Sequence, residues 1–110
     1  MIEIKDKKGI RLFTFDGREA RDKSGKRVIT VNGNEIRDRN GQRILKLISN
    51  EIQSSTGQRL YKFTGNEIQD RNGVRMYKYS ATELQDKVGS RILTMSGPVP
   101  PAVLAGLGLL

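Results

Sequence analysis

Short segments with alternating side-chain character recur along the chain between turn residues. Three of them are RVITVN (27–32), RILKLI (43–48) and RLYKFT (59–64), each rich in β-branched, leucine or aromatic side chains. Runs of this kind, bounded by Gly, Asn and Asp, predict β-strands, whose successive side chains point to opposite faces of a sheet. The 3.6-residue period of an amphipathic helix is absent, so we expect an all-β domain.

These segments belong to an internal repeat of 16 residues. Six units follow one another without insertion or deletion, at 2–17, 18–33, 34–49, 50–65, 66–81 and 82–97. When the six units are aligned, four positions, here called columns, hold the same kind of residue in every unit. They are a glutamate, the apolar residue after it, a glycine and an arginine. They are Glu3, Glu19, Glu35, Glu51, Glu67 and Glu83; Ile4, Ala20, Ile36, Ile52, Ile68 and Leu84; Gly9, Gly25, Gly41, Gly57, Gly73 and Gly89; and Arg11, Arg27, Arg43, Arg59, Arg75 and Arg91. Such self-similarity predicts a repeat architecture.

Each unit is expected to form one β-hairpin, because turn residues fall at its middle and at its end. Asn-Gly and Asp-Gly pairs tolerate the positive φ angles that tight hairpin turns require. The mid-unit turns are Lys8-Gly9, Ser24-Gly25, Asn40-Gly41, Thr56-Gly57, Asn72-Gly73 and Val88-Gly89. The end-of-unit turns are Asp16-Gly17, Asn32-Gly33, Ile48-Ser49, Thr64-Gly65, Ser80-Ala81 and Ser96-Gly97.

Charge complementarity favours two-residue turns at mid-unit. In the third unit this register pairs Asp38 with Arg43, Ile36 with Leu45 and Glu35 with Lys46; in the fifth it pairs Asp70 with Arg75, Ile68 with Tyr77 and Glu67 with Lys78. All of these pairs are complementary across strands. A three-residue loop with a bulge would instead place Arg37 opposite Arg43, so we prefer the first register.

In that register one sheet face is apolar and forms the expected core. In the third unit it carries Ile36, Asp38, Arg43, Leu45 and Leu47. Equivalent positions in the other units are Phe13, Phe15, Ile29, Val31, Tyr61, Phe63, Tyr77, Tyr79, Leu93 and Met95. The other face, with Glu, Arg or Gln, Ile or Leu, and Thr or Lys, is mixed and is expected to face solvent.

The expected architecture is an up-and-down antiparallel meander of about twelve short strands over residues 1–97. Such a sheet must protect its edges, and six equal units suit closure into a barrel-like or flower-like ring. The alternative is a β-solenoid with 16 residues in each coil, which the same turn spacing permits.

The last segment, 98–110, departs from the repeat. It is uncharged, apolar and rich in Pro and Gly, and its prolines prevent another strand of the same kind. It is too short to span a bilayer as a helix. It is expected either to form a short helix or an extended plug inside the ring, or to dock on a partner. The candidate interaction residues are Val99, Val103, Leu104, Leu107, Leu109 and Leu110.

Composition excludes several kinds of chemistry. The chain has no Cys, His or Trp, which excludes disulfides, thiolate or imidazole metal sites, and Ser-His-Asp or Cys-His catalysis. No phosphate-binding loop is present, and we expect no cofactor. The recurring aspartates Asp6, Asp22, Asp38, Asp70 and Asp86, replaced by Ser54 in the fourth unit, are expected to pair with the arginines rather than to bind a cation or catalyse a reaction.

The positive charges suggest anionic partners. Closure could bring the six recurring arginines around one axis as an anion site, with Arg59 the least neutralised because Ser54 replaces its acid. The net charge is +8, which favours polyanions such as nucleic acid. Most of the surplus lies in the first two and a half units, at Lys5, Lys7, Lys8, Arg18, Arg21, Lys23, Lys26, Arg37 and Arg39. The later aromatics Tyr61, Phe63, Tyr77 and Tyr79 are expected to point inward, away from this charge.

The runs GNEIRDRNGQRILKL and GNEIQDRNGVRMYKY resemble the small bacterial proteins of the β-flower type, built from G-N-x-I-x-D-x-x-G-x-R hairpin repeats around a central axis. The resemblance covers residues 2–97; this chain has six units where those proteins have four, and it lacks their Trp. It implies a fold and no established activity.

The sequence thus favours a non-enzymatic structural or interaction module, bacterial by resemblance. The expected partners are a second copy of the chain or another protein, bound through the tail. A basic polyanion-binding protein is the alternative. The N-terminus lacks the apolar core of a secretory signal, and no membrane span is expected, so the expected location is the cytoplasm.

Overall fold

The computed structural model describes residues 1–48 and 50–110 and contains, in that part of the chain, twelve β-strands and one helix. The strands are β1 Ile2–Asp6, β2 Arg11–Phe15, β3 Glu19–Asp22, β4 Arg27–Asn32, β5 Glu35–Asp38, β6 Arg43–Ile48, β7 Glu51–Ser54, β8 Arg59–Thr64, β9 Glu67–Asp70, β10 Arg75–Tyr79, β11 Glu83–Asp86 and β12 Arg91–Met95. The helix is α1 Pro101–Gly106.

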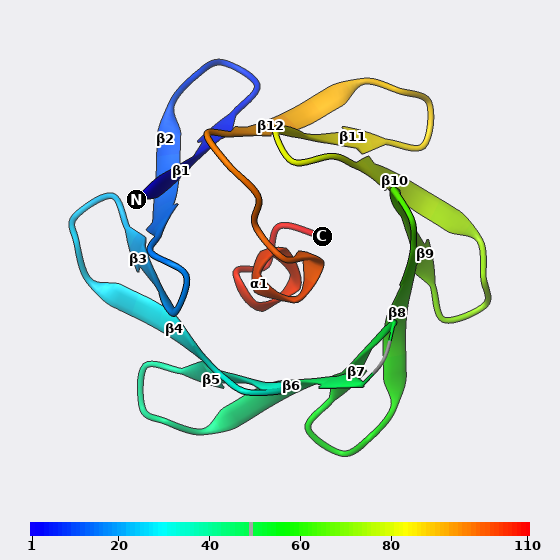
Figure 1. Cartoon of the computed structure of the whole chain (residues 1–110), viewed down its shortest axis with the longest axis horizontal. Helices are drawn as coiled ribbons and strands as arrows, with labels where there is room; N and C mark the ends of the chain where they lie inside the picture. The colour runs from blue at the N-terminus through cyan, green and yellow to red at the C-terminus, as the bar shows by residue number, and fades with distance from the viewer. Residues whose placement is uncertain (49) are drawn as a thin grey trace.

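The strands form one closed antiparallel ring. Each pairs with its neighbours in the sequence, and β1 pairs with β12 through Ile4 and Met95. The Cα atoms extend over 36 × 33 × 16 Å. The hairpin loops point outward from the ring (Figure 1). The expected closed meander of twelve strands is therefore confirmed. The alternative of a β-solenoid is wrong, because neighbouring strands run antiparallel and the first strand pairs with the last.

The interior of the ring is apolar. The recurring residue after each glutamate is buried in all six units, and β2, β4, β6 and β12 add larger side chains. The buried strand residues are Ile4, Phe15, Ala20, Ile29, Ile36, Leu45, Ile52, Ile68, Leu84, Leu93 and Met95. Most of the predicted core face is thus correct, with Phe13, Val31, Leu47, Tyr61, Phe63, Tyr77 and Tyr79 half-buried against this core.

The mid-unit turns differ from the predicted two-residue turns. Glu35 faces Lys46 and Ile36 faces Leu45 as expected, but the register then shifts and Arg37 faces Arg43. The pairing of Asp38 with Arg43 is therefore wrong, as is the position of Arg43 on the core face. The Asp38 N–H donates to the carbonyl of Gln42 at 2.9 Å, so the loop is longer than two residues. A bulge next to a residue in the left-handed region is a common hairpin closure, and Gly41 has φ of 83°.

The bulge also changes the burial of the residue after each arginine. The sequence pattern placed this column on the solvent-exposed face. In the structure five of its members are half-buried and pack against the core: Leu12, Val28, Ile44, Leu60 and Ile92. At the end of the second unit, Asn32 pairs with Glu35, so Gly33 and Asn34 form that two-residue turn, one residue later than expected.

The C-terminal segment fills the middle of the ring (Figure 1). Val99, Val103 and Leu104 are fully buried, and α1 contacts β4, β5 and β6. The Tyr79 hydroxyl donates a hydrogen bond to the Val99 carbonyl, which ties the segment to β10. Burial raises the pKa of Tyr79, and this hydrogen bond partly offsets the rise. Of the two expected arrangements, the structure has the segment inside its own ring.

Substitution of Gly106 by alanine is expected to destabilise the fold by about 1–2 kcal/mol, as overpacking does in a filled core. A Cβ atom at this position would lie 2.9 Å from Ile36 Cγ2 and 3.2 Å from Ile29 Cδ1. Urea unfolding measures the loss. The comparison is Gly97→Ala, which is expected to cost less, because its nearest atom, on the Ile2 side chain, is 3.2 Å away and no atom is closer. Equal stability of Gly106→Ala and the wild type would contradict this packing.

Candidate functional site

The recurring arginines lie at the outer ends of the hairpins, and each forms an ion pair with the glutamate of its own unit. The Nη1 to Oε2 distances are 3.1 Å for Arg43–Glu35 and Arg59–Glu51, and 3.3 Å for Arg75–Glu67. Arg11, Arg27 and Arg91 make the same pair at 3.5–3.7 Å. The acid partner of Arg59 is therefore Glu51, and the expectation that Ser54 leaves Arg59 less neutralised is wrong.

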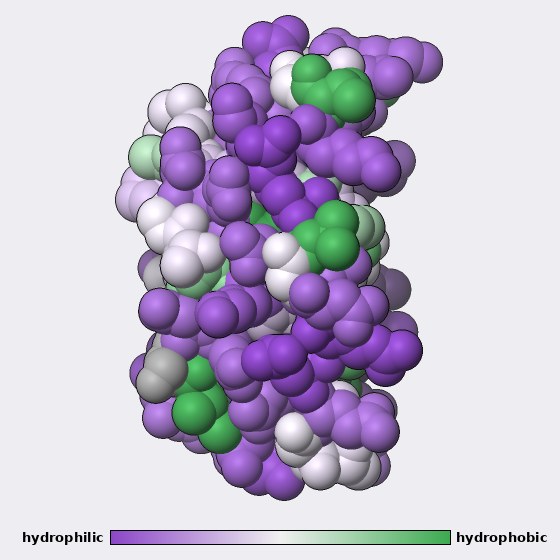
Figure 2. Space-filling model, turned by 90° about the vertical axis from the view of Figure 1, so that its right-hand side faces the viewer, coloured by the Kyte–Doolittle hydropathy of each residue, from purple (hydrophilic) through white to green (hydrophobic). Residues whose placement is uncertain are grey.

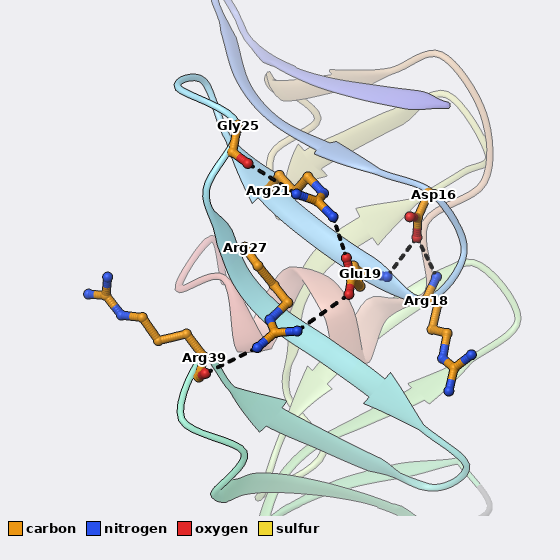
Figure 3. Close-up of polar contacts among 7 residues, drawn as sticks. All are labelled: Asp16, Arg18, Glu19, Arg21, Gly25, Arg27 and Arg39. Carbon is orange, nitrogen blue, oxygen red and sulfur yellow. Dashed lines mark hydrogen bonds and ion pairs between the residues drawn. The ribbon is translucent and has the colours of Figure 1, made fainter.

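Four of these arginines also link neighbouring hairpins. The Arg27 Nη2 group donates to the backbone carbonyl of Arg39, at the tip of the next hairpin, at 3.4 Å (Figure 3). The same bond joins Arg43 to Ser55, Arg59 to Arg71 and Arg75 to Lys87, at 2.7–3.4 Å. The structure thus spreads the arginine column around the outer surface, one guanidinium at each hairpin, and does not bring the six together around an axis.

The recurring aspartates stabilise the hairpin tips. Asp38 Oδ1 accepts hydrogen bonds from the backbone N–H groups of Asn40 and Gln42, at 2.9 and 3.0 Å. In the fourth unit the Ser54 hydroxyl accepts the equivalent bonds at 3.3 and 3.2 Å. Serine can therefore replace aspartate at this repeat position, because either side chain accepts hydrogen bonds from the N–H groups of the loop. Within the described residues, no group of three or more acidic side chains could hold a metal ion.

Hydrogen bonds lower the pKa of several acids. The Ser24 hydroxyl and the Lys26 backbone N–H lower the pKa of Asp22, and the Arg43 and Arg37 guanidiniums lower the pKa of Glu35. Arg59 and Gln53 do the same for Glu51. Because these groups are ionised more easily in the folded state, their stabilisation is complete above their ordinary pKa values and disappears as the pH falls through the lowered values.

The midpoint of urea unfolding is therefore expected to stay constant from pH 7 to about 5 and to fall below about pH 4.5, the ordinary pKa of Glu35 and Glu51. Unfolding curves at half-unit pH steps measure this. The variant Glu35→Gln is expected to show a shallower fall, because it carries one acid fewer to protonate. A midpoint that rises on acidification would contradict the assignment.

A second basic column recurs at the hairpin tips. The residue after each recurring aspartate is basic in five of six units, at Lys7, Lys23, Arg39, Arg71 and Lys87, with Ser55 in the fourth. All five side chains are exposed. None takes part in an ion pair among residues 1–48 and 50–110. Figure 3 shows the Arg39 side chain extending away from the Glu19 and Arg27 pair. Sequence analysis missed this column as a ring-wide feature, although the 16-residue alignment contains it.

The unpaired charge is concentrated on one half of the ring. Residues 2–49 contain thirteen basic and seven acidic residues, a net charge of +6, whereas 50–97 contain seven and five, a net charge of +2. Of the cations predicted as surplus, Lys5, Arg21 and Arg37 are paired with glutamates. We define the basic arc as the exposed tip cations of the first three hairpins, which form no ion pair within the described residues: Lys7, Lys8, Lys23, Lys26 and Arg39.

A groove lies within this half of the ring. It has a volume of about 480 Å³ and separates the hairpin β1–β2 from the hairpin β3–β4. Arg11, Arg21 and Lys23 line it, beside Met1 and Thr14. By contrast, Tyr61, Phe63 and Tyr77 pack against the core on the other half, so the predicted inward direction of these aromatics is confirmed. The basic arc thus offers cations without an aromatic stacking surface.

Comparison with known proteins finds no matching family model, no matching curated protein and no matching solved structure. The repeated hairpins with their regular glutamate and arginine spacing make the chain a hairpin-repeat protein. No helix in the described part of the chain is long and apolar enough to cross a membrane.

Proposed function

We propose that the chain is a non-enzymatic binding module, a rigid ring that displays hairpin tips, and that the basic arc binds the phosphate backbone of nucleic acid. The observation that carries this proposal is the set of five exposed tip cations on three neighbouring hairpins, none of which has an acid partner in the described residues. Lysine and arginine side chains supply the sequence-independent part of nucleic-acid binding by neutralising phosphates.

The distribution of ion pairs supports this site over the arginine column. Each recurring arginine already contacts a glutamate, and four also hold a neighbouring hairpin. At each of these four arginines both Nη1 and Nη2 already have a partner, so a phosphate would compete with the glutamate and with the neighbouring hairpin. Within the described residues the tip cations form no ion pair, so a phosphate that binds them breaks none. We therefore place the proposed contacts on the tips, while Arg11 and Arg21 line the groove beside them.

The recognition mode follows from the missing stacking surface. Base-stacking proteins use exposed aromatic side chains, and the aromatics of this ring are buried or half-buried in the core. Charge contacts alone position a nucleic acid without reading its sequence. We therefore propose binding that is independent of sequence and weak at high salt.

The tail is a less suitable interaction surface than the rim. Val99, Val103 and Leu104 are buried inside the ring, and Leu107, Leu109 and Leu110 are half-buried against the core. The described strands each have two partners, so an open sheet edge is also unavailable for pairing. The expectation of self-association rested on the tail, and we therefore place the proposed interaction on the basic arc instead.

We also propose that the ring is of the β-flower type, in a version with six hairpins, and that it is bacterial and acts in the cytoplasm. The arrangement of six outward-pointing hairpins around a central helix supports the type (Figure 1). A nucleic-acid partner is compatible with that location.

Fluorescence anisotropy with a labelled 30-base-pair duplex and a labelled 30-nucleotide single strand tests the function. We expect both to bind, with the logarithm of the association constant falling linearly with the logarithm of the salt concentration. Two oligonucleotide sequences of the same length are expected to bind within about twofold of each other. Absence of binding at 50 mM salt, or an affinity that salt does not change, would contradict the proposal.

A further inference from the structure

A pocket of about 530 Å³ lies where the last hairpin, β11–β12, meets the first, β1–β2. Its apolar lining comes from three parts of the chain: Ile10 and Leu12 of the first unit, Ile92 and Leu93 of the last, and Leu109 of the tail. A volume of this size is typical of small-molecule sites. The pocket is therefore built at the one junction that brings both ends of the repeat and the C-terminal segment together.

Two other junctions in the described part of the chain lack this combination. Grooves of about 350 Å³ occur between Leu60 and Met76 and between Met76 and Ile92, at equivalent places in the repeat. Neither is lined by a tail residue. At the ring closure, by contrast, Gly108 and Leu109 of the tail contribute to the lining.

The outer edge of the pocket is also unusual. Ile10 is 55 % exposed, in a column that is otherwise Lys26, Gln42, Gln58, Val74 and Ser90. Val74 and Val88 are the other exposed large apolar residues of the hairpin tips. Figure 2 shows apolar surface on the rim of the last hairpins as separate patches among hydrophilic residues. Of these exposed residues, Ile10 lines the pocket at the ring closure and extends its apolar surface to the rim.

The charges around the pocket favour an anion. Lys7 and Lys8 are exposed and unpaired in the described residues, and Arg91 contacts Glu83 at 3.7 Å, the longest of the arginine–glutamate pairs. The two acids in the lining already accept hydrogen bonds. Asp6 Oδ1 accepts from the N–H groups of Lys8 and Ile10, and Asp86 Oδ1 from those of Val88 and Ser90, at 2.8–3.0 Å. These bonds hold the two carboxylates at the loop backbone, and their negative charges remain. The lining still has a net positive charge, with three basic residues and two acidic ones above an apolar floor.

We propose that this pocket binds a small amphipathic carboxylate, with its apolar chain against Leu12, Ile92 and Leu109 and its carboxylate at Lys7 and Lys8. The pocket shares Lys7 and Lys8 with the basic arc, but its apolar lining lies outside the arc. The proposal therefore does not depend on nucleic-acid binding, and variants at Lys23, Lys26 and Arg39 distinguish the two functions. A neutral molecule with the same chain would bury the same surface but leave the lysines without a counter-charge.

Titration of the full-length protein with decanoate and with decanol, followed by NMR chemical shifts, tests the proposal. We expect decanoate to shift the amide signals of residues 6–12, 90–93 and 108–109, and to bind about tenfold more tightly than decanol. The double variant Lys7→Gln/Lys8→Gln is expected to remove this preference. Equal affinity for the two probes, or shifts spread over all six hairpins, would overturn the proposal.

Three further variants distinguish loss of the pocket from loss of folding and from loss of nucleic-acid binding. Ile10→Gln introduces the residue found at positions 42 and 58, and is expected to weaken decanoate binding several-fold. Val74→Gln makes the same change at another exposed tip and is expected to leave binding unchanged, as is Lys23→Gln/Lys26→Gln/Arg39→Gln in the basic arc. If Val74→Gln weakens binding as much as Ile10→Gln, the site is not at the ring closure.

Discussion

A chain that ends at Gly97 is expected to lose its cooperative fold. Residues 98–110 supply four of the fifteen buried apolar residues, Val99, Ala102, Val103 and Leu104. Complete burial of a Val or Leu side chain stabilises by about 1.5–3 kcal/mol, so the three larger side chains contribute about 5–9 kcal/mol. This equals much of the net stability of a small domain. Thermal unfolding followed by circular dichroism shows whether a cooperative transition remains, and the chemical-shift dispersion of the NMR spectrum shows whether the chain is folded.

A point variant distinguishes the effect of lost packing from the effect of shortening the chain. Leu104→Ala in the full chain is expected to cost about 2–5 kcal/mol, as buried leucines do, and to keep the same transition at a lower temperature. Pro98→Ala is the matched control, because Pro98 is exposed in the same segment and its change is expected to be small. A 1–97 chain that unfolds sharply within a few degrees of the wild type would show that the ring does not need its central segment.

The second large effect concerns the basic arc. The variant Lys23→Gln/Lys26→Gln/Arg39→Gln is expected to weaken duplex binding by about 100-fold or more at 0.1 M salt. Each phosphate contact contributes about 0.9 to the slope of log K against log salt, which is almost one factor of ten at this concentration. The salt slope is expected to decrease by about 3 for the same reason. Anisotropy titrations at four salt concentrations measure both quantities.

The control removes the same charge from another place. Lys46, Lys62 and Lys78 lie on β6, β8 and β10, opposite glutamates, and none forms an ion pair within the described residues. Their triple glutamine variant also has a net charge three units lower. It is expected to reduce affinity by less than tenfold. If both triple variants weaken binding equally, net charge and not the basic arc determines the affinity.

Most of the fold follows from the repeat, because its columns occupy equivalent places in every hairpin. The 16-residue period and the turn residues predict twelve strands, and six equal units predict closure. The apolar residue after each glutamate is buried in all six units, since the strand alternation fixes its direction. Glu35 opposite Lys46 follows from the same alternation.

The register at the hairpin tips does not follow from charge complementarity. Pairing Asp38 with Arg43 satisfies two charges, but Asp38 Oδ1 instead accepts two loop N–H groups that would otherwise lack partners. A side chain that satisfies local backbone donors competes with cross-strand pairing. The bulge then places Arg43 beside Glu35, and this arrangement determines which cations stay unpaired. The candidate site depends on that detail, so sequence analysis identified the basic surplus but not the tip column.

Lysine footprinting tests the central claim, that nucleic acid binds at the basic arc, most directly. The full-length protein is acetylated briefly with and without a saturating 30-base-pair duplex at 50 mM salt, and modification at each lysine is measured by mass spectrometry. We expect the duplex to protect Lys7, Lys8, Lys23 and Lys26 and to leave Lys46, Lys62 and Lys78 as reactive as before. Protection of the strand lysines instead of the tip lysines, or no protection at any lysine, would contradict the account.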